Sequence, residues 1–466
     1  MQNTFKALRG LTLAAIILAL PAVVAAQSDA RFSGTVLDQT GAFVPGATVT
    51  VKNQRTNEER TVAATNEGRY VVPNLKPSVY TIRVTFGSFE PLEYTDMTLA
   101  AGQEFSLDLE LRPAGVSETV TVTADTKVLD FSSARIGANV SEREVQALPV
   151  NGRQMSQLLL QAPGSQNAGT GTWQDIRFSG RAVEQNVIKY DGIEGSAIID
   201  ASPGNVNGEN NTPFKLQASL ENVQEFRVES SGYPAEYGTG TGGQISVITK
   251  SGSNAFHGSI FEYLRSEKFD APNYFDSTRN IDGSVIEKLP KSKLKQNQFG
   301  GSIGGPLMRD RAFFFGSYEG YRLDAGQNFI EGVPSAAAWA RAVPAVAGLR
   351  SGFLAPGAVV LNAASANPDF DIAQLQAIQR VKENAFSARF DYKMTTDWSS
   401  YIRVFHDQGT NRGPQGVTGR EFRTTANPSN AVFALQGLFG TGMTNELKVG
   451  YNAAPSTSRG VAPAGF

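Results

Sequence analysis

The sequence predicts a mainly β protein whose second half forms strands of an antiparallel barrel of the outer-membrane type. Apolar and polar residues alternate with period two in several segments, such as Phe105–Leu111, and this pattern is typical of half-buried strands. Connections between the strand candidates after residue 250 alternate between short and long, as an up-and-down barrel requires. Beyond the first 26 residues no apolar stretch reaches the ~18 residues of a membrane-spanning helix.

The first 26 residues have the three parts of a secretory signal peptide. Lys6 and Arg9 provide a positive segment, Leu11–Leu20 an apolar segment, and Val24–Ala26 a small-residue cleavage site. We therefore expect residues 1–26 to be removed on export. An N-terminal membrane anchor is the alternative, but the apolar run is short for a span of about 20 residues.

The composition narrows the classes of function. The chain has 42 basic and 44 acidic residues, a net charge of −2, which becomes −2 − 2 = −4 without the two basic residues of the signal peptide. A balance so near zero gives no electrostatic footprint for nucleic acid, so no nucleic-acid partner is expected. The chain has no cysteine and two histidines, which excludes disulfides and disfavours a zinc site.

Residues 27–112 are expected to form a small β-sandwich. Several alternating segments are separated by turn sequences such as Asp38–Gly41, at a spacing typical of a sandwich. Three segments resemble a carboxypeptidase regulatory-like domain: Ser33–Val36, Pro45–Val49 and Thr65–Tyr70. The resemblance implies a transthyretin-like sandwich without peptidase activity.

Residues 117–250 are expected to form an α+β domain. Extended segments alternate there with a helix-compatible stretch at Glu142–Gln161, and Tyr190–Gly192 carries a hairpin signal. Two runs resemble the plug of TonB-dependent receptors: Leu148–Arg153 and Ile248–Gly252. The typical plug has an Arg-Gly pair where this chain has Arg177-Phe178-Ser179-Gly180.

Residues 251–466 are expected to supply the N-terminal part of an outer-membrane β-barrel. Seven segments are candidate strands: 256–267, 295–304, 311–322, 384–394, 398–407, 429–439 and 444–452. Their connections are in turn long (268–294), short (305–310), very long (323–383), short (395–397), long (408–428) and short (440–443). Tight periplasmic turns and long outer loops are typical of such barrels, and a soluble barrel or sandwich is the alternative.

These candidate strands have one apolar and one polar face. Phe386 and Phe390 share one face, whereas Arg389 and Asp391 share the other. Turning the apolar face to lipid avoids the cost, ~2–4 kcal/mol, of a basic residue at the bilayer midplane. The strand at 398–407 is ambiguous because both of its faces carry large apolar side chains.

The segments Gln296–Pro306 and Phe313–Gly320 resemble the early barrel strands of Oar-like TonB-dependent receptors. Together with the sandwich and the plug, this resemblance extends over nearly the whole chain after the signal peptide. It implies a barrel of about 22 strands, so seven candidates indicate a fragment with an incomplete barrel. Ser458–Phe466 shows no alternation, and we interpret it as an arbitrary end of the chain.

An extended segment ahead of the plug resembles a TonB box: Glu118, Thr119, Val120, Thr121, Val122, Thr123 and Ala124. Such a segment can add a strand to a partner's sheet, where main-chain hydrogen bonds give affinity. The resemblance implies the periplasmic domain of TonB as the partner. A plain linker strand after the sandwich is the alternative.

Three further motifs are interpreted structurally. Gly300–Gly304 matches the Gly-x-Ser-x-Gly nucleophile motif but lies in a candidate strand, and Gly238–Gly243 matches a dinucleotide motif but precedes a strand. Asn205–Asn211, with nearby Asp200, is rich in oxygen ligands but lacks EF-hand spacing, so a plug loop is expected. We therefore predict no catalytic, cofactor-binding or metal-binding residues and no enzyme.

The sequence thus favours an outer-membrane receptor or transporter that moves a ligand through a plugged barrel, with TonB and outer-membrane lipid as partners. The ligand itself is an unknown extracellular molecule. The alternative is an adhesion or surface-structural protein without active transport.

Overall fold

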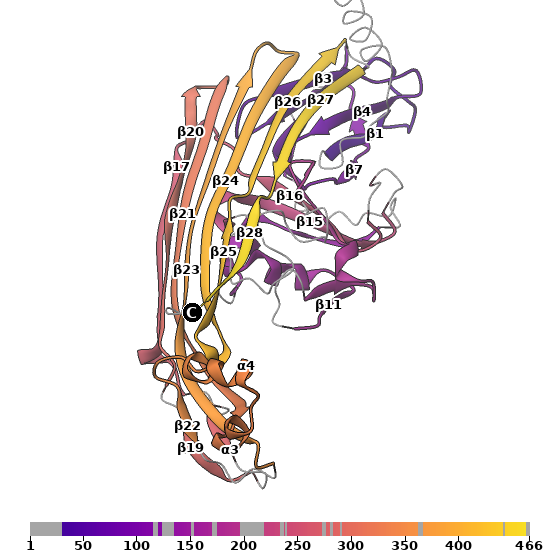
Figure 1. Cartoon of the computed structure of the whole chain (residues 1–466). Coiled ribbons are helices and arrows are strands. Elements are labelled where there is room, and N and C mark those ends of the chain that lie inside the picture. The colour runs from indigo at the N-terminus through magenta and orange to yellow at the C-terminus, as the bar shows by residue number, and fades with distance from the viewer. Residues whose placement is uncertain are drawn as a thin grey trace, which may run out of the picture.

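The structure is a computed structural model that describes residues 30–114, 120–123, 135–150, 153–169, 175–195, 219–233, 237, 240–272, 276–279, 283–288, 291–361, 367–440 and 443–462. These residues form a small sandwich, a second domain that we call the inner domain, and a long curved sheet that we call the barrel sheet (Figure 1). The predicted mainly β class is confirmed. The expected signal peptide lies outside the described residues. Among those described, no helix is long and apolar enough to cross a membrane.

The sandwich consists of two sheets that enclose one apolar core. The first sheet contains β1 (Ala30–Asp38), β4 (Arg69–Leu75), β7 (Glu104–Ser106) and β8 (Leu109–Leu111). The second has the order β3 (Glu59–Ala63), β2 (Thr48–Asn53), β5 (Ser78–Thr85), β6 (Leu92–Leu99) and β9 (Val120–Thr123). Phe32, Ile82 and Leu109 are fully buried between the sheets. The apolar residues of the alternating segments therefore point into this core.

The single strand expected at 105–111 is divided into β7 and β8. Between them the Leu107 amide donates to the Ser33 carbonyl at 2.7 Å, and the Thr35 amide donates to the Asp108 carboxylate at 2.8 Å. A Cβ at Gly34 would lie 1.9 Å from the Leu107 carbonyl oxygen. The close crossing of these two backbones therefore requires glycine at this position.

The inner domain is built on a five-stranded sheet, with short helices beside it. The strand order is β10 (Ile136–Val140), β15 (Val223–Ser231), β16 (Gln244–Thr249), β13 (Val187–Tyr190) and β14 (Ile193–Glu194). A hairpin of β11 (Ser165–Asn167) and β12 (Ile176–Phe178) packs with helix η2 (Met155–Gln161). Helix α2 (Glu142–Ala147) begins with a capping box formed by Ser141 and Glu144. The described residues of the stretch expected to be helix-compatible thus include the short helices α2 and η2.

The barrel sheet has ten strands. They are β17 (His257–Ser266), β20 (Leu294–Met308), β21 (Ala312–Pro334), β22 (Val359–Leu361), β23 (Phe370–Lys393), β24 (Trp398–Gln415), β25 (Arg420–Ala426), β26 (Ser429–Phe439), β27 (Met443–Ala453) and β28 (Ser456–Val461). The main path runs β17-β20-β21-β23-β24 with antiparallel pairing throughout. The first half of β24 then pairs with β26 and its second half with β25. Within the described residues, β17 pairs only with β20 and β27 only with β26, so the sheet is open.

The two ends of the barrel sheet differ in their connections. Tight connections join β20 to β21, β23 to β24 and β26 to β27, and they lie at the end nearer the sandwich (Figure 1). The long connections lie at the opposite end, where α3 (Ala336–Ala340), α4 (Pro344–Ala347) and the hairpin of β18 (Ser277–Arg279) and β19 (Val285–Lys288) are found. This is the asymmetry expected from the sequence.

Several strands are longer than predicted. The pairing of β21 with β23 continues to Pro334 and Phe370, well into the segment expected to be a loop. The segment 408–428 contains the end of β24 and all of β25, and Ser456–Val461 forms β28 although no strand was expected there. Near the long connections, neighbouring residues such as Ala373, Gln374 and Leu375 are all buried. Both faces of the strand are covered there, so backbone pairing continues without a period-two alternation in the sequence.

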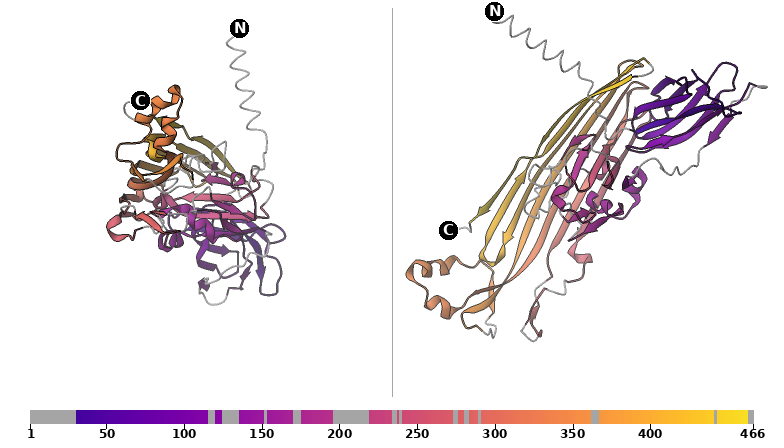
Figure 2. Two further views of the ribbon diagram at one scale, coloured as in Figure 1. Left: turned by 60° about the horizontal axis from the view of Figure 1, so that its bottom comes forward. Right: turned by 90° about the vertical axis from the view of Figure 1, so that its right-hand side faces the viewer.

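The outer face of the barrel sheet is apolar and exposed, whereas the inner face is polar and covered. Phe386 is 49% exposed and its neighbour Arg389, on the other face, is 7% exposed. The ambiguous strand is resolved in the same way, because Val404 is 45% exposed and Phe405 only 8%. The inner domain lies against the inner face (Figure 2). A face that is apolar and exposed in this arrangement is suited to lipid.

Candidate functional site

A two-residue turn in the inner domain places a carboxylate against the barrel sheet. Tyr190 pairs with Ile193, so Asp191 and Gly192 alone form the turn between β13 and β14. Their φ angles are +50° and +86°, as a type I′ turn requires, which confirms the hairpin predicted here. Thr249 at the end of β16 holds the carboxylate, donating from its amide at 3.0 Å and its hydroxyl at 2.8 Å.

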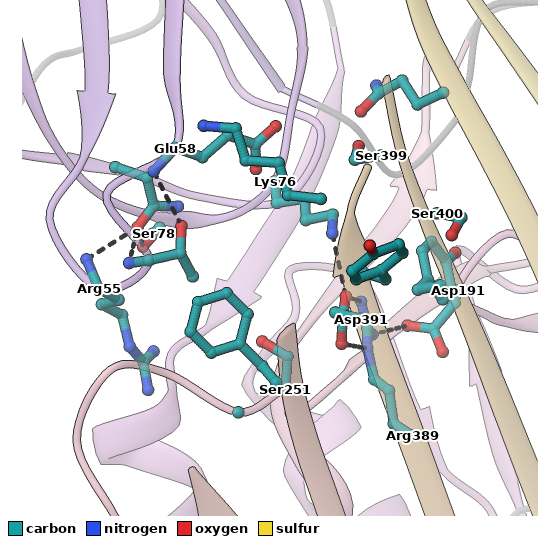
Figure 3. A pocket seen from close by; sticks show the side chains of 18 of the residues that line it. Arg55, Glu58, Lys76, Ser78, Asp191, Ser251, Arg389, Asp391, Ser399 and Ser400 are labelled. Atoms are coloured by element: carbon teal, nitrogen blue, oxygen red, sulfur yellow. Dashed lines mark hydrogen bonds and ion pairs between the residues drawn. The ribbon is translucent and has the colours of Figure 1, made fainter. Parts of the chain in front are cut away.

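Two arginines of the barrel sheet meet this carboxylate, and Figure 3 shows one of them, Arg389, beside Asp191. Arg403 in β24 donates from Nε to Asp191 at 2.9 Å and from Nη2 to the Tyr190 carbonyl at 3.2 Å. Arg389 in β23 has its Nη1 3.6 Å from Asp191 and donates to the Thr249 carbonyl at 3.3 Å. Both arginines are on the inner face because they are register partners in adjacent strands, and directly opposite residues of a sheet point to the same face.

The network continues to the sandwich. Arg389 forms a two-bonded pair with Asp391, with distances of 2.9 and 3.0 Å. Lys76, which follows β4 of the sandwich, donates to Asp391 at 3.1 Å (Figure 3). The residues Lys76, Asp391, Arg389, Asp191 and Arg403 therefore form a row of alternating charges, which we call the ionic chain. It connects all three parts of the molecule.

The charges of the ionic chain stabilise one another. Burial by itself raises the pKa of Asp191, but the guanidinium groups of Arg403 and Arg389 and the hydrogen bonds from Thr249 outweigh it, so the pKa lies below its ordinary value. Asp191 therefore stays ionised at neutral pH. The Tyr401 ring lies under the Arg389 guanidinium, 4.3 Å from its carbon, and adds a cation–π contact.

The cavity beside the ionic chain is small. It is lined by residues of all three parts, including Arg55, Lys76 and Ser400, and its volume is about 80 Å³. Pockets that enclose small-molecule ligands are typically ~300 Å³ or more. We therefore interpret the ionic chain as the contact that holds the three parts together rather than as a ligand pocket.

Further contacts dock the sandwich. Arg60 donates to Gln436 of β26 at 2.6 Å, and Asn57 donates to Asp310 in a tight turn of the barrel sheet at 2.8 Å. On the other side, the Ala101 amide donates to Glu225 of β15 in the inner domain. Burial raises the pKa of Glu225 to about 7. The sandwich thus contacts both other parts.

The Leu148–Arg153 run also reaches the barrel sheet. Arg153 has a φ of +53°, and its guanidinium carbon lies 4.5 Å from each of the Phe261 and Tyr263 rings of β17. It also donates to Glu221 of the inner domain at 3.0 Å. Arg153, the last residue of a run noted in the sequence for its resemblance alone, is therefore a further contact between the inner domain and the barrel sheet.

Four of the seven residues predicted as a TonB box are described. Val120–Thr123 form β9, which pairs in parallel with residues 92–95 of β6. Glu118, Thr119 and Ala124 lie outside the described residues, as does the Asn205–Asn211 loop. The box remains a prediction, since pairing alone does not assign a partner.

The two glycine motifs noted in the sequence lie in a strand and in a segment that leads into a strand. Gly300–Gly304 lies within β20, and Gly240–Gly243 leads into β16, with a Cβ at Gly243 2.2 Å from the Phe178 ring. Across the described residues, no group of three or more His, Cys, Asp or Glu residues could hold a metal ion.

Sequence reasoning placed three residues of the ionic chain without pairing them and missed the other two. Arg389 and Asp391 were assigned to the wet face and Asp191 to a turn, but Lys76 and Arg403 were not singled out. The available signal was the alternation itself, since a charged residue between outward-facing apolar residues, such as Arg403 between Ile402 and Val404, must face inward.

Comparison with known proteins assigns two regions to families. Residues 31–112 match the carboxypeptidase regulatory-like domain, and residues 248–465 match an outer membrane beta barrel domain. The TonB-dependent transporter Oar of Myxococcus xanthus is 28% identical over 301 residues, which are 61% of this chain and 26% of that protein. The chain thus spans about a quarter of the length of this relative.

Solved outer-membrane transporters are similar in part. The match to the transporter YddB of Escherichia coli has a TM-score of 0.47 and 11% identity, and covers 69% of this chain and 39% of that one. The match to the alcaligin receptor FauA of Bordetella pertussis has a TM-score of 0.37 and 12% identity, and covers 71% and 49%. From its sequence matches, the chain is a homologue of the TonB-dependent transporter Oar, an outer-membrane protein with a carboxypeptidase regulatory-like domain and an outer-membrane β-barrel domain.

Proposed function

We propose that the protein is a TonB-dependent receptor that moves an extracellular ligand through a plugged outer-membrane barrel. The observation that carries the proposal is the position of the inner domain, which covers the polar inner face of a sheet whose outer face is apolar and exposed. In this proposal the inner domain is the plug. The ionic chain holds it by charge-assisted hydrogen bonds, which fix geometry and can be exchanged for water when the plug moves.

The proposed coupling acts through residues 118–124. TonB pairs with this extended segment and pulls on it, and the force reaches the inner domain at Arg135 and β10. Because β10 is the edge strand of the inner sheet and pairs only with β15 among the described strands, a pull can peel it away first. The sheet then opens one strand at a time rather than shearing as a whole.

The test is the binding of the purified periplasmic domain of TonB to the protein in detergent. Replacing both Val120 and Val122 by proline removes two main-chain donors from the segment, and we expect it to abolish binding. The matched variant with threonine at both positions keeps the donors and the β propensity, and should bind as wild type.

Assembly of the wild type and of both variants is measured in the cells that produce them, by the access of protease to the long connection 335–369. If the proline variant assembles normally but loses both TonB binding and ligand uptake, the result supports transport. If the proline variant binds TonB as well as wild type, the box assignment is wrong. Adhesion without transport is then the better explanation.

A further inference from the structure

The edge of β6 in the sandwich accepts a strand from another part of the chain. Residues 92, 93, 94 and 95 are in register with residues 120, 121, 122 and 123 of β9, and the two strands run in parallel. Strand β9 is therefore the outermost strand of the second sandwich sheet, in the order β3-β2-β5-β6-β9. The backbone groups that β9 turns toward β6 are engaged in this pairing.

Strand β6 has a bulge at the end of the pairing that the structure describes. Thr95 and Asp96 together face the single residue Thr81 of β5, which makes a bulge, and Asp96 has a φ of +61°. A bulge twists a strand edge and ends regular pairing there. Among the described residues the pairing of β9 with β6 ends at Thr95, beside this bulge, and includes four residues of each strand. A contact of this length is suited to release.

The sandwich that carries the acceptor edge is anchored to the barrel sheet through residues outside β6 and β9. Lys76, Arg60 and Asn57 fasten the sandwich to the barrel sheet through Asp391, Gln436 and Asp310. None of these contacts involves β9. A pull on β9 therefore breaks its pairing with β6 before it loads β10 of the inner domain.

We propose that the β6 edge, residues 92–95, is a strand-accepting surface that stores residues 120–123 and competes with TonB for them. This inference rests on the proposed function, because it assumes that 118–124 is the segment TonB binds. TonB adds its own strand to the same short segment, and the segment leaves β6 when TonB takes it. The sandwich thus keeps the receptor uncoupled until TonB displaces the edge contact.

The experiment joins the two strands by a reversible cross-link. Cysteines replace Glu93 and Thr121, which are register partners, and the chain has no other cysteine that could form a competing disulfide. Paired strands bring Cα atoms within the range that a disulfide requires. The matched control places cysteines at Thr50 and Thr61, which are partners in β2 and β3 of the same sheet, away from β9.

The probe is the purified periplasmic domain of TonB, and binding to the intact protein in detergent is measured before and after reduction. We expect oxidised E93C/T121C to bind roughly tenfold or more weakly than the same protein reduced. Oxidation of T50C/T61C should leave the affinity unchanged.

Two results would overturn the storage role. One is equal binding by oxidised and reduced E93C/T121C while the proline variant of Val120 and Val122 still loses binding, which leaves the proposed function standing. The other is failure of the E93C/T121C disulfide to form when that of T50C/T61C does. If the proline variant itself binds normally, both the storage role and the box assignment fail.

Discussion

Asp191 of the inner domain and Arg403 of the barrel sheet form a buried ion pair with 2.9 Å between Oδ2 and Nε. The side chains are 4% and 2% exposed, and they are 212 positions apart in the sequence. Because neither charge is well hydrated, each depends on the other for its stability. The pair therefore reports directly on whether the inner domain is seated in the barrel sheet.

Replacing Asp191 by Asn should release the inner domain. Asn tolerates the positive φ of this turn, so the change removes the charge and leaves the backbone preference intact. Arg389 keeps Asp391 as a partner, but Arg403 is left without a carboxylate, at a cost of about 3–5 kcal/mol. Hydrogen exchange of the β13 and β16 amides measures the loss.

The matched control is Asp369→Asn, which breaks the exposed pair with Arg341. It should cost at most about 1 kcal/mol because water screens exposed pairs. If the β13 and β16 amides of Asp191→Asn are as well protected from hydrogen exchange as those of the wild type, the ionic chain does not hold the inner domain.

Replacing Val404 by Arg should impair insertion. Val404 is on the outer face of β24, and a basic residue there costs up to ~2–4 kcal/mol at the bilayer midplane. The measurement is the denaturant midpoint for refolding into lipid vesicles. Thr396→Arg, at an exposed position of the tight connection before β24, is the control and should refold as wild type. Equal midpoints for the two variants would mean that this face does not meet lipid.

Alternation predicted which residues of a strand share a face but not how far a strand continues. The segment 429–439 was predicted to the residue because turn residues, Asn427-Pro428 and Gly440-Thr441-Gly442, flank both of its ends. Strand β23 begins at Phe370 rather than at 384, because neighbouring residues such as Ala373, Gln374 and Leu375 are all buried, and no period-two alternation marks that half. Pairing partners such as Asp191 and Arg403 depend on how two domains dock, and a local sequence pattern carries no information on that.

Replacing Gly243 by Ala should disturb the inner core. The new Cβ would lie 2.2 Å from the ring of Phe178, which is fully buried, and overpacking of this kind costs about 1–3 kcal/mol. Thermal unfolding measures the change. The second variant Phe178→Leu should recover part of the loss in the Gly243→Ala background, whereas Gly348→Ala, with open space around its Cβ, should have no effect. Full stability of Gly243→Ala would show that the Phe178 ring is not confined there.

Docking of the sandwich on the inner domain should weaken as the pH rises through about 7. Burial, with a smaller contribution from Glu142, raises the pKa of Glu225 from 4.5 to about 7 despite the hydrogen bond from the Ala101 amide. A raised pKa in the folded state means that Glu225 favours docking fully below pH 4.5 and loses this contribution as the pH rises through 7, in total about 3 kcal/mol. Glu225→Gln keeps an acceptor for Ala101 without a charge, so its docking should vary less between pH 5 and 8. Hydrogen exchange of the β6 amides across this range compares the two proteins. Identical pH dependence would show that Glu225 is already ionised in the docked state.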